Sequence, residues 1–485
     1  MANEIAYNRS ALRDFLGSVA TVSGDLSNIT APPFVLSENS TVEIPQYWAD
    51  HPSLFVSQGA EEDAERRSLS VLKYFLGTLR NQQYAGRSEG SGVKKPLNAF
   101  LGELFLGHWK DEELGETRLV AEQVSHHPPI TACYLWNDKH GVRAQGFTQQ
   151  EITFSGNVIV KQKGYAMLHL DKWEEDYLIP VPNIKVKGIF GGVPYPELEG
   201  DYSLISSNGY ISKIKFSGKS FFGSGQKHKF EAKLYHSDRP DQILYTAGGA
   251  WNGKITFNDA RSGKEIESFN AQKIESVKVQ VADLAEQDPW ESRNAWQEVV
   301  GALNNGNMRG VANAKSRLED GQRHMREEEQ ATGKQWQTVF FERKERDPIF
   351  DKLSALDPGS FIVDKAGGVW KANREAIQNV RKPYHGDLLP NNERVKTENS
   401  PRDSGVDVSE QNGVAVTSAA QDQAADSEET AEANGHVFNN LALRQREINS
   451  QERKRAPSIS ATTYKEPTDE QVEAFLRARH SNAYR

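Results

Sequence analysis

The chain has 485 residues, a formal net charge of −9 at pH 7 and 37% hydrophobic residues. This length allows one large domain or two to three ordinary ones, and the low apolar content predicts a folded core diluted by polar sequence. The negative charge argues against broad binding to nucleic acid or anionic membranes, so any anion site must be a local basic cluster. With a single cysteine, Cys133, no signal-peptide pattern and no apolar run of roughly 20 residues, a soluble cytoplasmic protein is expected.

Residues 11–20 predict an amphipathic helix, because apolar side chains recur there at i, i+3, i+4 and i+7. These side chains are Leu12, Phe15, Leu16 and Val19. The polar face of the helix is poor in lysine and rich in small residues. A proline pair at 32–33 ends this leader.

Residues 67–84 again show helical periodicity, and from about residue 117 to residue 274 the period changes to two. Turn signals such as Asn208-Gly209 separate the strand-like runs of this region. The runs include Ile130–Trp136, Val158–Lys161, Ile184–Lys187, Tyr210–Phe216 and Phe230–Tyr235. So many short sequential strands predict an antiparallel meander that closes into a barrel with room for an internal cavity.

The C-terminal third returns to helical patterns and then becomes polar. The expected elements are helices over Glu291–Leu303 and Val311 to about Gln330, and a last folded element within Ser354–Ala376 anchored by Trp370. Residues 386–460 are rich in Asn, Ser, Ala, Gln and Glu, which predicts a disordered polar linker. A capping-box pattern predicts a short helix within the tail 461–485.

The stretch Glu122–Ala132 reads EQVSHHPPITA and contains two adjacent histidines followed by two prolines. Each proline fixes its own φ and pushes the preceding residue towards extended backbone, so Ser125, His126 and His127 are expected on a stiff extended segment. Imidazoles held in this way can donate hydrogen bonds to an anion, bind a metal, or act as acid and base. Without further partners, a purely structural role at a strand end is an equally good interpretation.

Metal binding and catalysis are both disfavoured. Neighbouring residues on an extended chain point to opposite sides, and no His-x-x-x-His or Cys-x-x-Cys spacing supplies further ligands. Gly223-Ser224-Gly225 is not a nucleophile elbow, and the Rossmann and P-loop glycine patterns do not occur. We therefore expect no enzyme activity, no metal and no cofactor.

Two further basic segments offer partners for the histidines. Lys95 and Asn98 lie in a basic turn, and Lys315, Glu319 and Arg323 fall within about 80° of arc on one helix face. On a single helix such a triad is more often an ordinary solvated charge ladder. Combined with the histidines, however, these segments supply six donors and one carboxylate, which suit a phosphate monoester on a sugar ring.

These segments resemble the motifs of the oxysterol-binding protein family. Every position of Glu122–Ala132 fits the family fingerprint, and Lys95–Asn98 with Phe100–Glu103 is similar to the second motif. The one departure there is Ala99, where relatives usually have proline. The helical triad matches the third motif. The likeness runs from about residue 15 to residue 337 and is closest to short fungal members that consist of the lipid-binding domain alone.

The resemblance implies an α+β fold, an incomplete antiparallel β-barrel with a central lipid tunnel and flanking helices at both ends. Residues 1–31 would form an amphipathic lid and residues 32–385 the lipid-binding domain. Within this domain the resemblance and the periodicity together place helices at about 60–110, the barrel at about 115–275 and the C-terminal helices at about 285–380.

The resemblance also implies two sets of ligand-binding residues. The inositol phosphate would be held by Lys95, Asn98, His126, His127, Lys315, Glu319 and Arg323. The sterol would contact Trp48, Gln83 and Tyr84 and the lid residues Phe15, Val19, Leu26 and Ile29.

The function implied is exchange of a sterol for phosphatidylinositol 4-phosphate between membranes, with both ligands competing for one lidded tunnel. A phosphatidylserine exchanger and a sterol-gated regulator without net transport stay open as alternatives. We expect a monomer that touches membranes transiently, at the Golgi and endoplasmic reticulum, and does not bind nucleic acid.

Overall fold

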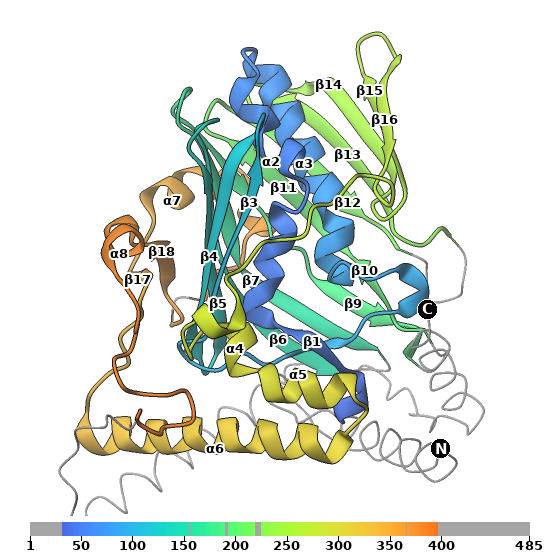
Figure 1. The fold of residues 1–485 in the computed structure, drawn as a ribbon. Coiled ribbons are helices and arrows are strands. Elements are labelled where there is room, and N and C mark those ends of the chain that lie inside the picture. Colours follow the sequence, from blue (N-terminus) through green and yellow to red (C-terminus); the bar gives the residue numbers. More distant parts are fainter. Residues whose placement is uncertain (1–31, 155–156, 190–192, 219–224, 365, 396–485) are drawn as a thin grey trace, which may run out of the picture. The chain divides into compact units, whose positions relative to one another are not determined.

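The computed structural model describes residues 32–395 except for short gaps at 155–156, 190–192, 219–224 and 365 (Figure 1). Every described residue belongs to one compact unit of the chain. The predicted lid over residues 1–31, the linker beyond residue 395 and the tail 461–485 lie outside the described residues.

A 14-stranded antiparallel sheet is the main body of the fold. Its order is β16-β15-β14-β13-β12-β11-β8-β7-β6-β5-β4-β3, with β9 beside β7 and β10 beside β9. The strands are β3 (Leu104–Asp111), β4 (Gly115–His126), β5 (Pro129–Asn137), β6 (Val142–Phe154), β7 (Val158–Leu170), β8 (Glu175–Ile179), β9 (Ile184–Lys187), β10 (Tyr195–Leu198), β11 (Gly200–Ser206), β12 (Tyr210–Phe216), β13 (Lys229–His236), β14 (Arg239–Ala250), β15 (Lys254–Asp259) and β16 (Glu265–Asn270). The sheet curls without pairing β3 to β16, so the predicted α+β fold with an incomplete antiparallel barrel is confirmed (Figure 1).

Side-chain alternation decides which face of each strand lies inside the barrel. On β12, Ile214 and Phe216 are buried, whereas Lys213 and Lys215 between and before them are exposed. This period of two is the pattern that the sequence displayed.

A seam runs along the free edge of β3. The segment that follows β16 returns beside this strand, where His108 and Gln280 exchange two backbone hydrogen bonds of 2.9 Å. Further along, the amide of Leu104 donates to the carbonyl of Trp290 at 2.9 Å. Two isolated bridges therefore cover this edge in place of a continuous ladder.

Helices α2 (Pro52–Ala60) and α3 (Ala64–Tyr84) lie across the open side of the sheet (Figure 1). Asp63 caps the start of α3, because its carboxylate accepts a hydrogen bond from the amide of Arg66 at 2.9 Å. The helix ends at Ala85, which adopts a left-handed conformation with φ of 48°. The helix predicted over residues 67–84 is thus confirmed, with three more residues at its start.

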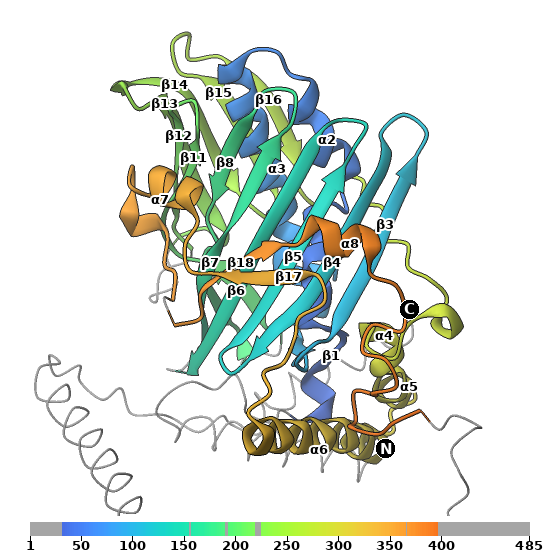
Figure 2. The ribbon, with the colours of Figure 1, turned by 90° about the vertical axis from the view of Figure 1, so that its left-hand side faces the viewer.

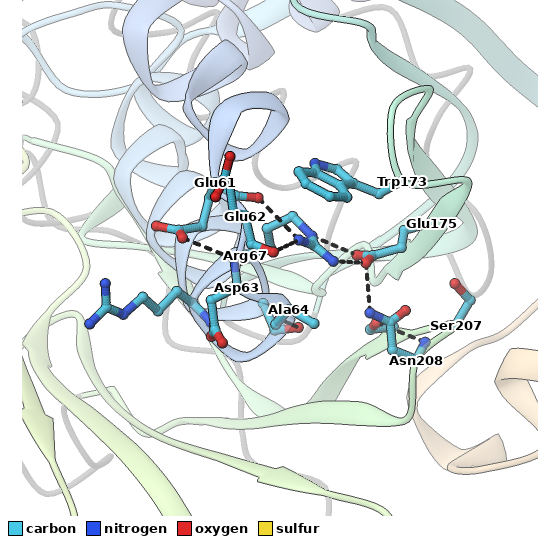
Figure 3. A network of polar contacts seen from close by, with 12 residues as sticks. Glu61, Glu62, Asp63, Ala64, Arg67, Trp173, Glu175, Ser207 and Asn208 are labelled. Atoms are coloured by element: carbon cyan, nitrogen blue, oxygen red, sulfur yellow. Dashed lines mark hydrogen bonds and ion pairs between the residues drawn. The ribbon is translucent and has the colours of Figure 1, made fainter.

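A buried ion pair joins the first turns of α3 to β8 (Figure 3). The Nε of Arg67 donates to Glu175 at 3.1 Å, and its guanidinium lies 4.2 Å from the ring centroid of Trp173. Glu175 also accepts hydrogen bonds from Tyr177 at 2.6 Å and Asn208 at 2.7 Å. Both charged side chains are almost fully buried, so each depends on the other for its neutralisation.

The C-terminal part adds helices at one end of the barrel and a small sheet on its outer face. Its elements are α4 (Ser292–Ala295), α5 (Gln297–Asn304), α6 (Met308–Thr332), β17 (Phe341–Lys344), α7 (Pro348–Ser354), β18 (Val369–Ala372) and α8 (Arg374–Asn379). Figure 2 shows β17, β18 and α8 against the outer face of the sheet, and α6 beneath one end of the strands. Short elements complete the fold, namely η1 (Pro33–Val35), β1 (Leu36–Ser40), η2 (Thr41–Trp48), η3 (Glu89–Ser91), β2 (Lys95–Leu97), η5 (Leu284–Glu286) and η6 (Pro358–Ser360).

Several predicted boundaries differ from the structure. The barrel begins at Leu104, inside the stretch assigned to helices, because Leu104–Asp111 pairs with β4 along its whole length. The helix expected over Glu291–Leu303 is interrupted at Trp296. Residues assigned to the polar linker contact α6, where Gln322 donates to the carbonyl of Pro390 at 2.7 Å. No helix among the described residues is long and apolar enough to cross a bilayer.

Candidate functional site

The two histidines lie at the tip of the β4–β5 hairpin. His126 ends β4 and pairs with Pro129, so His127 and Pro128 form the two-residue turn between the strands. The ring centroids of His126 and His127 are 4.7 Å apart. The expected stiff extended segment with imidazoles on opposite sides is therefore wrong, because pairing across the hairpin turns the chain and brings both rings together.

Backbone contact fixes the tautomer of His126. Its Nδ1 lies 3.0 Å from the carbonyl oxygen of Ala99, which can only accept, so Nδ1 carries a hydrogen. Burial, the neighbouring His127 and the charge of Arg326 lower the pKa of His126 to about 4. At neutral pH the ring is uncharged and its Nε2 is an acceptor. Burial and Arg326 also lower the pKa of His127.

The basic turn is positioned by a short parallel pair of strands. Lys95 starts β2, which pairs with β1, and Asn98 follows directly after the strand. The amide of Ala99, which a proline would lack, donates to Oγ1 of Thr41 at 3.3 Å. The departure from the family motif at Ala99 thus adds a hydrogen bond to the turn.

Lys95 lies close enough to α6 for charged side chains of that helix to change its pKa. Burial and the charge of Lys315 lower the pKa of Lys95 to about 8, and Glu319 partly offsets this effect. Lys315 itself forms an ion pair with Glu319, and its side chain is only 12% exposed. Five predicted residues, Lys95, His126, His127, Lys315 and Glu319, are therefore brought together.

Two arginines of α6 have different surroundings, one of them in the predicted set and one outside it. Arg323 is 60% exposed and pairs with Asp320 at 2.7 Å. The charge that acts on both histidines belongs to Arg326, which the motifs did not include. Helical spacing is the signal that could have identified it, since eleven residues place Arg326 about 20° from Lys315, against about 80° for Arg323.

An internal cavity opens beside the basic cluster. Its lining atoms surround about 950 Å³ of space, part of it open to solvent. The lining is mixed: apolar side chains such as Trp48, Phe75 and Ile179 alternate with amides and hydroxyls. A smaller pocket is bordered by Lys95 and Asn98. The two spaces share four lining residues, Thr41, Thr131, Thr148 and Gln150.

The predicted sterol-binding residues divide into three groups. Trp48 and Gln83 line the cavity, and Oε1 of Gln83 is buried without a hydrogen-bond partner among the described residues. Tyr84 does not line it, because one helical residue turns its side chain by about 100°, and its hydroxyl lies 3.4 Å from Nε2 of His228. The lid residues Phe15, Val19, Leu26 and Ile29 lie outside the described residues.

The cavity holds further polar and ionisable groups. Cys133 lines it, and burial raises the pKa of this thiol to about 12, so the thiol is neutral and unreactive at physiological pH. In the part of the chain that the structure describes, no group of three or more His, Cys, Asp or Glu side chains could hold a metal ion. The site is thus a cavity of mixed apolar and polar lining beside a basic, hydrogen-bonding mouth.

A sheet curled around a cavity with a basic mouth is the arrangement expected of a lipid-binding protein. A family model described as "Oxysterol-binding protein" matches residues 15–379. The chain belongs to the oxysterol-binding protein family.

Relatives agree with this membership, and solved structures share the fold. "Probable transporter efuK" of Hormonema carpetanum is 52% identical over 378 residues, which are 77% of this chain but only 54% of that protein. "Protein kes1" of Schizosaccharomyces pombe is 40% identical over 351 residues, 71% of this chain and 90% of that protein. The Osh1 ORD domain in complex with cholesterol has a TM-score of 0.57 at 20% identity, covering 74% of this chain and 86% of that one. The Osh3 ORD in complex with PI(4)P from Saccharomyces cerevisiae has a TM-score of 0.54 at 21% identity, covering 69% and 86%.

Proposed function

We propose that this protein exchanges a sterol for phosphatidylinositol 4-phosphate between membranes. The observation that carries the proposal is the lining shared by the cavity and by the pocket beside Lys95 and Asn98. A lipid whose phosphorylated headgroup occupied the basic mouth would have its hydrocarbon directed into the cavity. The similar structures that contain cholesterol and PI(4)P support both ligands.

The headgroup would be bound by the basic mouth. Lys95, His126, His127 and Lys315 offer donors to phosphate oxygens, and Asn98 and Glu319 suit the hydroxyls of an inositol ring. Arg323 contacts Asp320 through Nη1, and its other guanidinium N–H groups would be further donors. Because the free His126 ring is neutral and has only an acceptor at Nε2, a bound phosphate dianion would favour its protonation.

The sterol would occupy the same cavity in its turn. Its rings need apolar contact, since exposing several hundred Å² of apolar surface costs many kcal/mol at roughly 25 cal/mol per Å². The unpartnered Oε1 of Gln83 is an acceptor for the single hydroxyl of a sterol, and Trp48 lies on the same lining. Because the two ligands would compete for one space, a phosphoinositide gradient would drive sterol transport without covalent chemistry.

The lid and the site of action complete the proposal. The apolar face of residues 11–20 would cover the bound hydrocarbon and, when open, touch a membrane with little help from charge. The protein would then act in the cytoplasm as a monomer that contacts membranes transiently, with the Golgi and endoplasmic reticulum as the two compartments.

A liposome assay tests the exchange. A fluorescent sterol in donor vesicles is mixed with acceptor vesicles that contain or lack phosphatidylinositol 4-phosphate, in the presence of a small amount of protein. We expect faster sterol transfer with the phosphoinositide, and many sterols moved per protein. Transfer that stops at one sterol per protein would instead indicate a regulator, and faster movement of phosphatidylserine than of sterol would indicate the other exchanger.

The pKa of Lys95 predicts a pH dependence. Because burial and Lys315 lower this pKa to about 8, Lys95 loses its positive charge as the pH rises through that value. Histidine and phosphate monoester groups titrate below this range, so headgroup affinity should fall by up to about tenfold between roughly pH 8 and pH 9. Lys95→Arg keeps its charge and should remove the fall. Calorimetry with soluble glycerophosphoinositol 4-phosphate measures how affinity changes with pH in the unmodified protein and in Lys95→Arg. An equal fall in both proteins would show that Lys95 is not the group that titrates.

A further inference from the structure

The inner face of strands β5 and β6 becomes polar towards the β4–β5 tip. Residues two apart on a strand share one face, so alternate cross-strand pairs can be followed along this wall. The pairs far from the tip are small or apolar, whereas the last pair consists of two threonines, and Gln150 continues the same face of β6. In this order the pairs are Leu135 with Ala144, Cys133 with Gly146, and Thr131 with Thr148. Hydrocarbon alone would not require hydrogen-bonding groups at this level.

Measured contacts place these polar groups between the basic mouth and the cavity. The four residues that line both spaces are called the polar neck: Thr41, Thr131, Thr148 and Gln150. Oγ1 of Thr41 accepts a hydrogen bond from the amide of Ala99 in the basic turn at 3.3 Å. Thr131 donates to Oε1 of Gln123 at 2.6 Å, and Nε2 of Gln123 donates to the carbonyl of Ser125 at 3.0 Å, in the hairpin that carries the two histidines. The polar neck is therefore joined to both headgroup-binding segments.

Two members of the polar neck have hydrogen-bond donors to offer. Thr148 and Gln150 are half-buried, and within the residues that the structure describes their side chains have no hydrogen-bond partner. The hydroxyl of Thr148 and the amide NH₂ of Gln150 are donors, whereas Thr131 has already donated its hydroxyl hydrogen to Gln123. Half-buried donors without acceptors have lost part of their hydration and gained no hydrogen bond in exchange.

We propose that the polar neck binds the glycerol ester carbonyls of a diacyl phospholipid, with Thr148 and Gln150 as donors. Between its headgroup and its hydrocarbon such a lipid has a phosphodiester and two ester groups, whose oxygens can only accept hydrogen bonds. A sterol has no acceptor in the middle of its ring system, so these donors stabilise one ligand and not the other. This inference rests on the proposed function and adds to it the residues that distinguish its two ligands.

The experiment compares two lipids that differ only at the level of the polar neck. Dioctanoyl phosphatidylinositol 4-phosphate and its dioctyl ether analogue share the headgroup and the chain length, but the ether lacks both carbonyl oxygens. Calorimetry with the full chain measures both affinities. We expect the unmodified protein to bind the ester lipid about tenfold more tightly than the ether lipid, since two neutral hydrogen bonds are lost in the ether complex.

Three variants assign this preference to residues. Thr148→Val and Gln150→Leu each remove one donor and should reduce the ratio of the two affinities to about threefold or less. Thr153→Val is the matched control, because it makes the same change on the opposite face of β6, and Thr153 lines neither space. Its ratio should equal that of the unmodified protein. Sterol affinity should stay within about twofold in all three variants, which would show that the cavity is intact.

Several results would overturn the assignment. Equal affinity of the unmodified protein for the ester and the ether lipid would exclude ester recognition. A preference that survives both Thr148→Val and Gln150→Leu, or that Thr153→Val reduces equally, would show that the polar neck is not its source. If the unmodified protein bound glycerophosphoinositol 4-phosphate but did not prefer the ester lipid, only this inference would fail. If it bound neither lipid nor the soluble headgroup, the proposed function itself would fail as well.

Discussion

Replacing His126 and His127 together by alanine is expected to weaken phosphoinositide binding by about 100-fold or more while sterol binding stays nearly unchanged. The two rings lie 4.7 Å apart at the hairpin tip, where one phosphate can contact both. Each charge-assisted hydrogen bond to phosphate contributes roughly 1.5–3 kcal/mol, so losing two removes most of the headgroup affinity. Neither histidine lines the cavity that would hold the sterol rings.

The measurement is extraction of each lipid from vesicles, followed in the same protein preparation. His324→Ala is a matched control, because His324 is exposed on α6 about 180° away from Lys315. It should behave like the unmodified protein. An equal loss of sterol binding in the double variant would mean that the histidines maintain the fold of the hairpin and do not bind the headgroup.

Arg67→Ala should destabilise the fold by about 3–5 kcal/mol, since it leaves the carboxylate of Glu175 buried without its cation. Both side chains are at most 7% exposed, and the pair connects α3 to β8 across the open side of the sheet (Figure 3). Burial would raise the pKa of Glu175, yet hydrogen bonds from Arg67, Tyr177 and Asn208 lower it. The pair therefore stabilises the fold above the ordinary carboxyl pKa, and its contribution is lost as the pH falls through the lowered one.

Urea denaturation at neutral pH measures this effect, with Lys344→Ala as the control. Lys344 pairs with Glu342 at 2.8 Å, but both side chains are about half exposed. Its loss should cost less than about 1 kcal/mol. If Arg67→Ala cost no more than Lys344→Ala, the buried pair would not secure α3 to the barrel.

Sequence patterns predicted the strands whose ends are determined by neighbouring turns and by alternating side chains. The strands Ile184–Lys187 and Tyr210–Phe216 have the predicted limits, because turns and alternating side chains determine where they begin and end. The strand Leu104–Asp111 was missed, since its pairing with β4 and the returning segment is long-range. Contacts of residues 386–395 with α6 are polar and equally distant in sequence, so composition gave no sign of them.

In the candidate site, too, some features could be predicted from local sequence and others depend on the folded structure. Motifs identified Lys95, His126 and Lys315, whose side chains the fold gathers at one place. They also included Arg323, and spacing along a helix did not reveal that Asp320 pairs with it. Tyr84 was grouped with Gln83, but consecutive residues of a helix point about 100° apart. Only Gln83 lines the cavity, whereas the hydroxyl of Tyr84 lies near His228. The sequence therefore indicated which residues come together, but it gave less information on the direction in which each side chain points.

The seam along β3 is a place where the barrel wall is joined by few hydrogen bonds. Many neighbouring strands elsewhere are joined by long ladders such as the thirteen paired positions of β6 and β7, whereas β8 and β11 share two. Among the described residues, the free edge is joined at the seam by three backbone hydrogen bonds, donated by Leu104, His108 and Gln280. The indole of Trp109 adds one to the carbonyl of Val277 at 2.9 Å. Each contributes roughly 0.5–1.5 kcal/mol net, so widening the wall here costs far less than separating a long ladder such as that of β6 and β7. A flat ring system and a pair of flexible chains differ in cross-section, and a barrel that bound both in turn would have to change its girth at such weakly paired lines.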